Sequence, residues 1–116
     1  MPLQETSGAA SYDAFGGGVA AVPNYIEDVF STYLYTGNGS TQTITNGIDL
    51  SGKGGMVWAK GRSVAYSHHL YDTNRGAGYR LLSNTTDAQA YSASLFLTAF
   101  NNNGFSLGSG QALNES

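Results

Sequence analysis

Residues 30–62 read FSTYLYTGNGSTQTITNGIDLSGKGGMVWAKGR and alternate between strand-forming and turn-forming runs. In the first run, residues 30–36, the aromatic, aliphatic and hydroxyl side chains suit a pleated, half-buried surface. The glycines and polar residues at positions 37–40 tolerate positive φ angles and predict a tight turn. Residues 41–45 then return to a β-rich pattern with one apolar anchor, Ile44. These features predict two successive antiparallel strands.

The same alternation continues to the end of the stretch. Asn46-Gly47 predicts another turn, and residues 48–50 alternate between apolar and polar side chains. A glycine-rich break at residues 52–55 precedes an apolar strand at residues 56–60, which carries the only tryptophan, Trp58. The stretch therefore predicts β structure throughout.

Further strands are predicted downstream, at residues 66–72, 79–84, 94–100 and 105–108. The clearest hairpin joins the last two through Asn101–Gly104, because Asn and Gly tolerate the left-handed region. Residues 84–93 are polar and predict a loop, and residues 111–116 are polar and predict no closing strand. We expect the core to contain Leu34, Val57, Trp58, Phe96 and Phe105.

Bulk composition excludes several classes of function. The 116 residues suit one domain, and the absence of cysteine excludes disulfides and thiolate metal sites. Charged residues make up 11% of the chain and the net charge is −3, so no basic surface for nucleic acid or membrane binding is expected. The longest weakly apolar run, residues 16–22, is far shorter than the roughly 20 residues of a membrane-spanning helix.

The N-terminal region predicts an extended arm, because residues 1–22 show neither helical nor strand periodicity. Two interpretations remain open: a docking segment that becomes ordered on a partner, or a frayed terminus. Residues 24–29 predict either one short helical turn or an extended lead. We place the arm at residues 1–28 and the β domain at residues 29–116. The predicted docking residues of the arm are Leu3, Tyr12, Phe15, Tyr25 and Ile26.

No motif predicts catalysis, a metal or a cofactor, and the chain is therefore predicted not to be an enzyme. His68 and His69 are adjacent, so in a strand their side chains would point to opposite faces and could not easily share one ion. A calcium site at Asn101–Asn103 lacks carboxylates. Asp72 and Arg75 flank a turn, and we expect them to form an ion pair that orders it rather than a contact to a substrate.

Tyrosines suggest one binding function, because exposed aromatic rings stack on the apolar faces of sugars. The alternative is that they are half-buried residues of the sheets. The predicted glycan-contact residues are Tyr66, Tyr71, Tyr79 and Tyr91.

Several motifs taken together resemble the repeated domain of tail-fibre and related virion proteins of cyanophages and marine phages. These are Y-T-G-N-G-S followed by I-x-N-G-x-D-L, the strand G-G-M-V-W-x-K, the turn D-T-x-R-G, and the hairpin N-x-x-G-F-x-L-G. The resemblance covers residues 29–110. It implies an all-β fold, a lectin-like (jelly-roll) antiparallel sandwich of the concanavalin A type, preceded by the arm.

The chain departs from that family pattern after the last hairpin, where a further strand of the type V-x-W-x-F would follow. The departure implies either that the chain is the N-terminal part of a longer fibre or that another subunit completes the sandwich. The resemblance implies a virion protein that is made in the host bacterial cytoplasm. It also implies a homo-oligomer, a trimer, which attaches to the baseplate or tail through its arm and contributes to host adsorption.

Two alternatives to the fibre remain. One is a carbohydrate-binding module that recognises host surface polysaccharide, and the other is a capsid decoration or adaptor protein.

Overall fold

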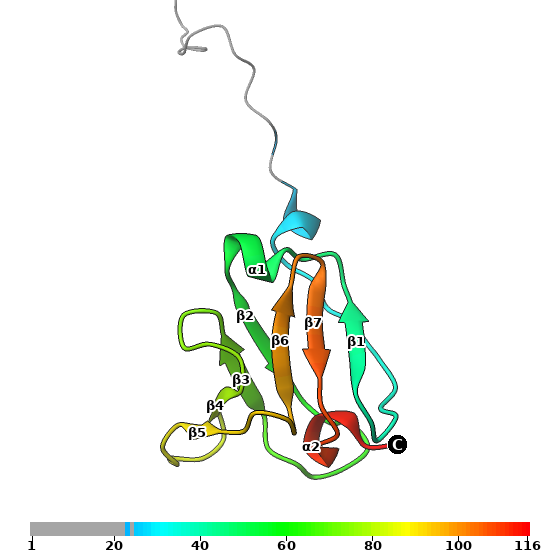
Figure 1. Ribbon diagram of the computed structural model, residues 1–116, viewed down its shortest axis with the longest axis vertical. Coiled ribbons are helices and arrows are strands. Elements are labelled where there is room, and N and C mark those ends of the chain that lie inside the picture. Colours follow the sequence, from blue (N-terminus) through cyan, green and yellow to red (C-terminus); the bar gives the residue numbers. More distant parts are fainter. Residues whose placement is uncertain (1–22, 24) are drawn as a thin grey trace, which may run out of the picture.

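Two antiparallel sheets form the body of the protein in a computed structural model that describes residue 23 and residues 25–116 (Figure 1). One sheet has the order β1-β7-β6, with β1 at Gln42–Thr45, β7 at Gly104–Leu107 and β6 at Leu97–Asn101. The other has the order β2-β3-β4-β5, with strands at Met56–Ala59, His69–Asp72, Tyr79–Leu82 and Ala90–Tyr91. The prediction of an all-β antiparallel sandwich is confirmed. Of the predicted arm at residues 1–28, residues 1–22 and residue 24 lie outside the described residues.

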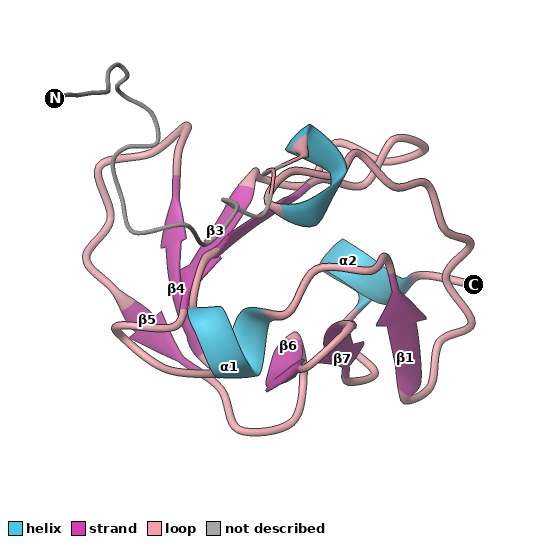
Figure 2. Ribbon diagram, turned by 90° about the horizontal axis from the view of Figure 1, so that it is seen from above, coloured by secondary structure: helices cyan, strands magenta, loops and turns pink. Residues whose placement is uncertain are grey.

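Three short helical segments accompany the sheets: η2 at Ile26–Asp28, α1 at Leu50–Lys53 and α2 at Gln111–Asn114. Helices α1 and α2 lie at opposite ends of the sandwich (Figure 1). The view from above shows the two sheets as separate layers, with α2 beside β7 and the chain before β1 passing along the open side (Figure 2). The sandwich is therefore completed at its ends and its open side by helical turns and loop segments.

The core lies between the sheets and collects the inward-facing residues of both. Its buried apolar members are Ile44, Leu50, Val57, Ala59, Tyr71, Leu97, Phe105, Leu107 and Leu113. Strand alternation explains this selection. In β2, Val57 and Ala59 point inward while their neighbours point outward, and in the other sheet Ile44 lies directly opposite Phe105.

The predicted core is correct in part. Val57 and Phe105 are buried, and Phe96 is partly buried against the core. The prediction that Trp58 is buried is wrong: 60% of its surface is exposed, because the alternation of β2 places it on the outer face. The prediction for Leu34 is also wrong: 72% of its surface is exposed, because it does not lie in a strand.

The predicted first strand, residues 30–36, is the main error. This segment forms no strand, and its N–H groups from Ser31 to Thr36 make no backbone hydrogen bond with the described part of the chain. The physical reason is that no neighbouring strand pairs with this segment: β1, the next strand along the chain, pairs with β7 instead. A sequence that suits a strand forms one only where a neighbouring strand offers a ladder.

Two further segments differ from the prediction: a short helical turn forms in one and a short strand in the other. The expected alternation at residues 48–50 instead leads into α1, which starts where the Asp49 carboxylate accepts a hydrogen bond of 2.8 Å from the Gly52 N–H. Leu50 in this turn is buried. Residues 84–93, expected to be a loop, include the two-residue strand β5. The expected hairpin is confirmed as β6–β7, closed by Asn102 and Asn103.

The C-terminal segment is held by the side chain of Asn114, which is fully buried. Its Oδ1 accepts hydrogen bonds from the Asn38 N–H at 2.9 Å and from Nε2 of Gln42. Its Nδ2 donates to the Gly108 carbonyl at 2.8 Å and to the Ser40 carbonyl. A carboxamide offers two donors and two acceptor positions, so the hydrogen-bonding capacity of this buried amide is fully used.

The backbone around Asn114 adds to this contact. The Gly39 N–H donates to the Asn114 carbonyl at 2.8 Å, and the Tyr35 hydroxyl donates to the Leu113 carbonyl at 2.6 Å. At Gly37 a β-carbon would lie 2.1 Å from the Glu115 carbonyl oxygen, so only glycine allows the two segments to approach this closely. Residues 35–42 and 108–115 are therefore joined into one unit.

Asn114→Ala is expected to destabilise the protein by about 2 to 4 kcal/mol, because it leaves buried donors and acceptors without partners. The measurement is urea unfolding followed by circular dichroism. Asn102→Ala is the matched control, since Asn102 is exposed in the β6–β7 turn. Equal stability of the two variants would contradict the role of the Asn114 amide.

Candidate functional site

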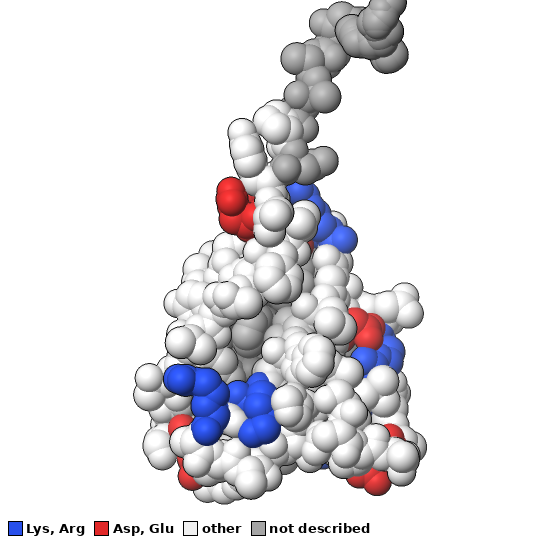
Figure 3. Space-filling model, turned by 180° about the vertical axis from the view of Figure 1, so that it is seen from behind, with Lys and Arg blue, Asp and Glu red and all other residues white. Residues whose placement is uncertain are grey.

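An open groove of about 740 Å³ lies between three segments of the chain. One wall is the extended segment 33–37, another is the loop 60–64 after β2, and α2 with the residues after it completes the lining. On the rear face, Figure 3 shows a hollow with a group of basic side chains below it. The basic residues of the groove lining are Lys60 and Arg62.

The walls of this groove are fixed by hydrogen bonds. Nζ of Lys60 donates to the Val64 carbonyl at 3.0 Å and to the Gly61 carbonyl, which folds the loop back on itself. The Tyr35 hydroxyl donates to the Leu113 carbonyl across the base of the groove. Burial raises the pKa of Tyr35, so this phenol remains a protonated donor at neutral pH. The groove thus offers aromatic, aliphatic and cationic groups, together with the acidic side chain of Glu115.

Sequence reasoning missed this groove. The segment 33–37 was predicted as part of a strand, and nothing in its residue pattern shows that it would form a groove wall. Lys60 was predicted to end the strand at residues 56–60, and no role was predicted for Arg62. The only available signal was that two of the five basic residues of the chain are separated by a single residue.

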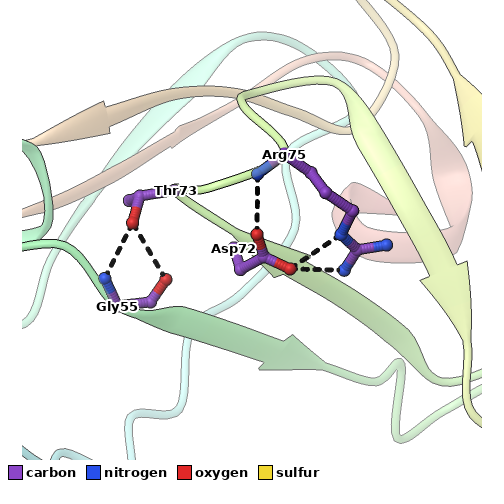
Figure 4. Close-up of polar contacts among 4 residues, drawn as sticks. All are labelled: Gly55, Asp72, Thr73 and Arg75. Atoms are coloured by element: carbon purple, nitrogen blue, oxygen red, sulfur yellow. Dashed lines mark hydrogen bonds and ion pairs between the residues drawn. The ribbon is translucent and has the colours of Figure 1, made fainter.

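The D-T-x-R-G motif has a structural explanation (Figure 4). Nε and Nη2 of Arg75 each contact Oδ2 of Asp72 at 2.7 Å, and the Arg75 N–H donates to Oδ1 at 2.8 Å. The predicted ion pair is therefore confirmed, and hydrogen bonding to Arg75 lowers the pKa of the Asp72 carboxyl. The Gly55 N–H donates to Oγ1 of Thr73 at 3.0 Å, while the Thr73 N–H donates to the Gly55 carbonyl at 3.0 Å. The motif orders the β3–β4 turn and ties it to the start of β2.

The two adjacent histidines have separate surroundings. His69 is buried on the inner face, where Nδ1 shares a hydrogen bond of 2.9 Å with the Tyr71 hydroxyl. His68 accepts a hydrogen bond of 3.0 Å from Nε1 of Trp58, whose side chain is exposed on the outer face. Within residues 25–116, no group of three or more His, Asp or Glu side chains is placed to hold a metal ion.

Burial, and to a lesser extent the charge of Arg80, lowers the pKa of His69 to about 4. An unfolded histidine titrates near 6.5, so between these two values the unfolded chain binds a proton that the folded chain does not. The contribution to stability is complete above about pH 6.5 and is lost as the pH falls towards 4. Over this window the free energy of unfolding is expected to fall by up to about 3 kcal/mol.

His69→Asn tests this dependence, because Asn retains a polar group near the Tyr71 hydroxyl but does not titrate. Urea unfolding between pH 7 and pH 4.5 should show a clear loss of stability for the unmodified protein and a flatter profile for the variant. Parallel profiles would show that His69 is not the group responsible.

The tyrosines predicted to contact glycans do not form one site. Tyr71 is fully buried in the core, so its prediction as a glycan contact is wrong; strand alternation in β3 turns it inward. The Tyr66 hydroxyl donates to Oε1 of Gln111 at 3.4 Å, beside α2. Tyr79 and Tyr91 lie together on the outer face of the four-stranded sheet, with ring centroids 4.6 Å apart.

The predicted docking residues are only partly within the described chain. Leu3, Tyr12 and Phe15 lie outside the described residues. Tyr25 and Ile26 are described and exposed, Ile26 at 75% of its surface. They stand at the start of η2, which matches the expected short helical turn before the sandwich.

Three comparisons with known proteins give one match. A family model described as a domain of unknown function (DUF7483) matches residues 26–116. No curated protein and no solved structure matches the chain. Within the described residues, no helix has the length and apolar character needed to cross a membrane.

Proposed function

The chain belongs to the DUF7483 family, and we propose that it is a non-enzymatic structural protein of a phage virion. In this proposal it is a homo-oligomeric tail-fibre component, attached to the tail or baseplate through the segment that precedes its sandwich. The resemblance of its motifs to phage fibre domains motivates the assignment, and the resemblance also implies that the oligomer is a trimer.

The observation that supports attachment is the exposure of the apolar lead, defined as residues 25–34. Its large apolar side chains lie outside the core, and the exposed ones are Tyr25, Ile26, Val29, Phe30, Tyr33 and Leu34. Fully burying one such side chain contributes roughly 1.5 to 3 kcal/mol. Docking of this lead on a partner protein would therefore supply a substantial binding energy.

The sandwich can act as a rigid module that holds such a lead. The Asn114 contacts join the segment that follows the lead to the last helical turn, so the lead enters the domain at a fixed place. The lead itself makes few contacts with the fold, because its residues 31–34 make no backbone–backbone hydrogen bond with the described residues. Binding of a partner to the lead would thus leave the sandwich intact.

Ile26→Asp combined with Phe30→Asp is expected to reduce incorporation into particles at least tenfold, because two charges would be placed in the docking surface. Both side chains are exposed, so the fold should be unaffected. The measurement is immunoblotting of purified particles, after complementation of a phage that lacks the gene.

The matched control for this experiment is Thr43→Asp combined with Thr45→Asp, on the exposed face of β1. Equal incorporation of the lead variant and the control would contradict attachment through the lead. Absence of the unmodified protein from particles would contradict the virion assignment itself.

A second candidate function, recognition of host surface polysaccharide, is favoured by the groove. Tyr33 provides an exposed aromatic ring for stacking on a sugar, and Lys60 and Arg62 suit an acidic sugar. The tyrosines first expected to bind glycans do not share a site, so the groove is the better location.

Arg62→Ala and Tyr33→Ala are each expected to weaken binding to an acidic polysaccharide about tenfold, measured on a glycan array and by calorimetry. Tyr91→Ala, at a residue outside the groove lining, should bind as the unmodified protein does. If the unmodified protein binds no acidic glycan, this candidate function fails while the structural one stands.

A further inference from the structure

The outer faces of the two sheets have opposite chemical character. On the three-stranded sheet, the outward side chains are small and polar. Oγ1 of Thr43 and Oγ of Ser106 lie 3.4 Å apart, and Nδ2 of Asn101 donates to the same Ser106 hydroxyl at 3.1 Å. This is the surface expected of a sheet that faces water on one side.

The outer face of the four-stranded sheet is apolar across its width. Direct pairing places Trp58 beside Leu70 and Leu70 beside Leu81, which makes one row over three strands. Tyr79 is two residues from Leu81 on the same face and pairs with Tyr91 on β5. We call this surface the apolar face; its residues are Met56, Trp58, Leu70, Tyr79, Leu81 and Tyr91.

Much of this apolar face is in contact with solvent. Trp58 is 60% exposed, Met56 59% and Tyr91 58%. Exposed residues of these types are unusual in such a contiguous arrangement, and contiguous exposed apolar patches mark interaction sites. The outer face of the three-stranded sheet, called the polar face below, shows that this chain does place Thr and Ser outward where a sheet meets solvent.

Side chains of the apolar face are held in place. Nε1 of Trp58 donates to Nδ1 of His68, and the two rings meet edge to face at 5.8 Å. The Tyr91 ring packs over Gly78, where a β-carbon would lie 2.8 Å from the ring. Little side-chain entropy of Trp58 and Tyr91 would therefore be lost on binding, which favours association.

We propose that the apolar face packs against the equivalent face of a second copy of this chain. The proposal deepens the proposed function and rests on it, since it assigns the homo-oligomer interface of the fibre component. Packing of two equivalent faces on each other forms a two-fold dimer, whereas in a trimer the three equivalent faces would converge on the three-fold axis.

Charge favours a second copy as the occupant. None of the six residues of the apolar face is charged, so two copies can meet without like charges coming together. Asp72, which is paired with Met56 at the margin, has its carboxylate engaged by Arg75. A partner selected by charge would find no complementary group on this surface.

Area also fits self-association. The exposed parts of these six side chains amount to roughly 500 Å², given about 150 to 250 Å² for a whole aromatic residue. A stable interface buries about 800 Å² per partner, of which about 60% is apolar. The apolar face therefore supplies the apolar part of one standard interface.

Trp58 allows a direct test, because it is the only tryptophan of the chain and lies at the proposed contact. Light scattering of the full chain should give a mass of two or three copies. Dilution should shift the Trp58 emission to longer wavelength as the apolar face becomes exposed. Met56→Lys combined with Leu81→Lys should weaken association at least tenfold without changing the circular dichroism spectrum.

Thr43→Lys combined with Thr45→Lys, on the polar face, is the matched control and should associate as the unmodified protein does. Three outcomes would overturn the proposal. One is a monomer at about 100 µM with emission typical of exposed tryptophan. Another is an oligomer that persists unchanged in the Met56→Lys, Leu81→Lys variant. The third is a monomer with buried-type emission that is lost on deletion of residues 1–22, which would show that the chain's own N-terminal segment covers the face.

The virion assignment has a separate readout. A monomer that is nonetheless incorporated into particles would overturn the apolar-face contact and the homo-oligomeric state, and would leave the virion assignment standing. An oligomer that is absent from particles would overturn the virion assignment and leave the apolar-face contact standing.

Discussion

The buried carboxamide of Asn114 is the contact on which the arrangement of this small domain most depends. A sandwich of seven short strands has an open side, and here that side is closed by segments that belong to no sheet. The amide connects these segments to one another through four hydrogen bonds, two accepted and two donated. Since each of its polar positions has a partner, burial carries no desolvation penalty that is left uncompensated.

This contact also explains the Y-T-G-N-G-S motif at residues 35–40. The Tyr35 hydroxyl donates to the Leu113 carbonyl, and the Gly39 N–H donates to the Asn114 carbonyl. Gly37 leaves room for the Glu115 carbonyl. The side chain of Asn114 accepts a hydrogen bond from the Asn38 N–H and donates one to the Ser40 carbonyl. A motif that reads as a simple turn is in fact the complement of the last helical turn.

The sequence was sufficient to predict the fold class and most strands, because alternation and turn residues are local properties. Strand β2, the β6–β7 hairpin and the Asp72–Arg75 pair all follow from short-range patterns. What local pattern does not contain is the choice of partner. Residues 30–36 have the composition of a strand but no ladder to join, and Trp58 was expected inside because of its size rather than its position in β2.

The candidate site was less predictable for the same reason. The groove exists only because segment 33–37 lies beside loop 60–64 without pairing in a sheet, which no residue pattern indicates. Tyr71 was expected at the surface, but a tyrosine whose hydroxyl meets a buried histidine is satisfied in the core. Asn114 carried no sequence signal at all, since its role depends on segments about 70 residues away.

These surfaces give the domain three separate means of contact, which suits a protein that works by assembly. The apolar lead precedes the sandwich, the groove lies on its open side, and the apolar face covers the outer side of the four-stranded sheet. Self-association would then use residues of its own, whereas Tyr33 and Leu34 belong both to the apolar lead and to the groove lining. We propose, above all, that the protein is a structural component of a phage tail.

Immunogold electron microscopy of purified particles, with an antibody against the sandwich, tests that claim most directly. The account predicts gold on the tail or its fibres, at the same place on most particles. Label on the capsid would indicate a decoration or adaptor protein instead, and particles without label would contradict the virion assignment.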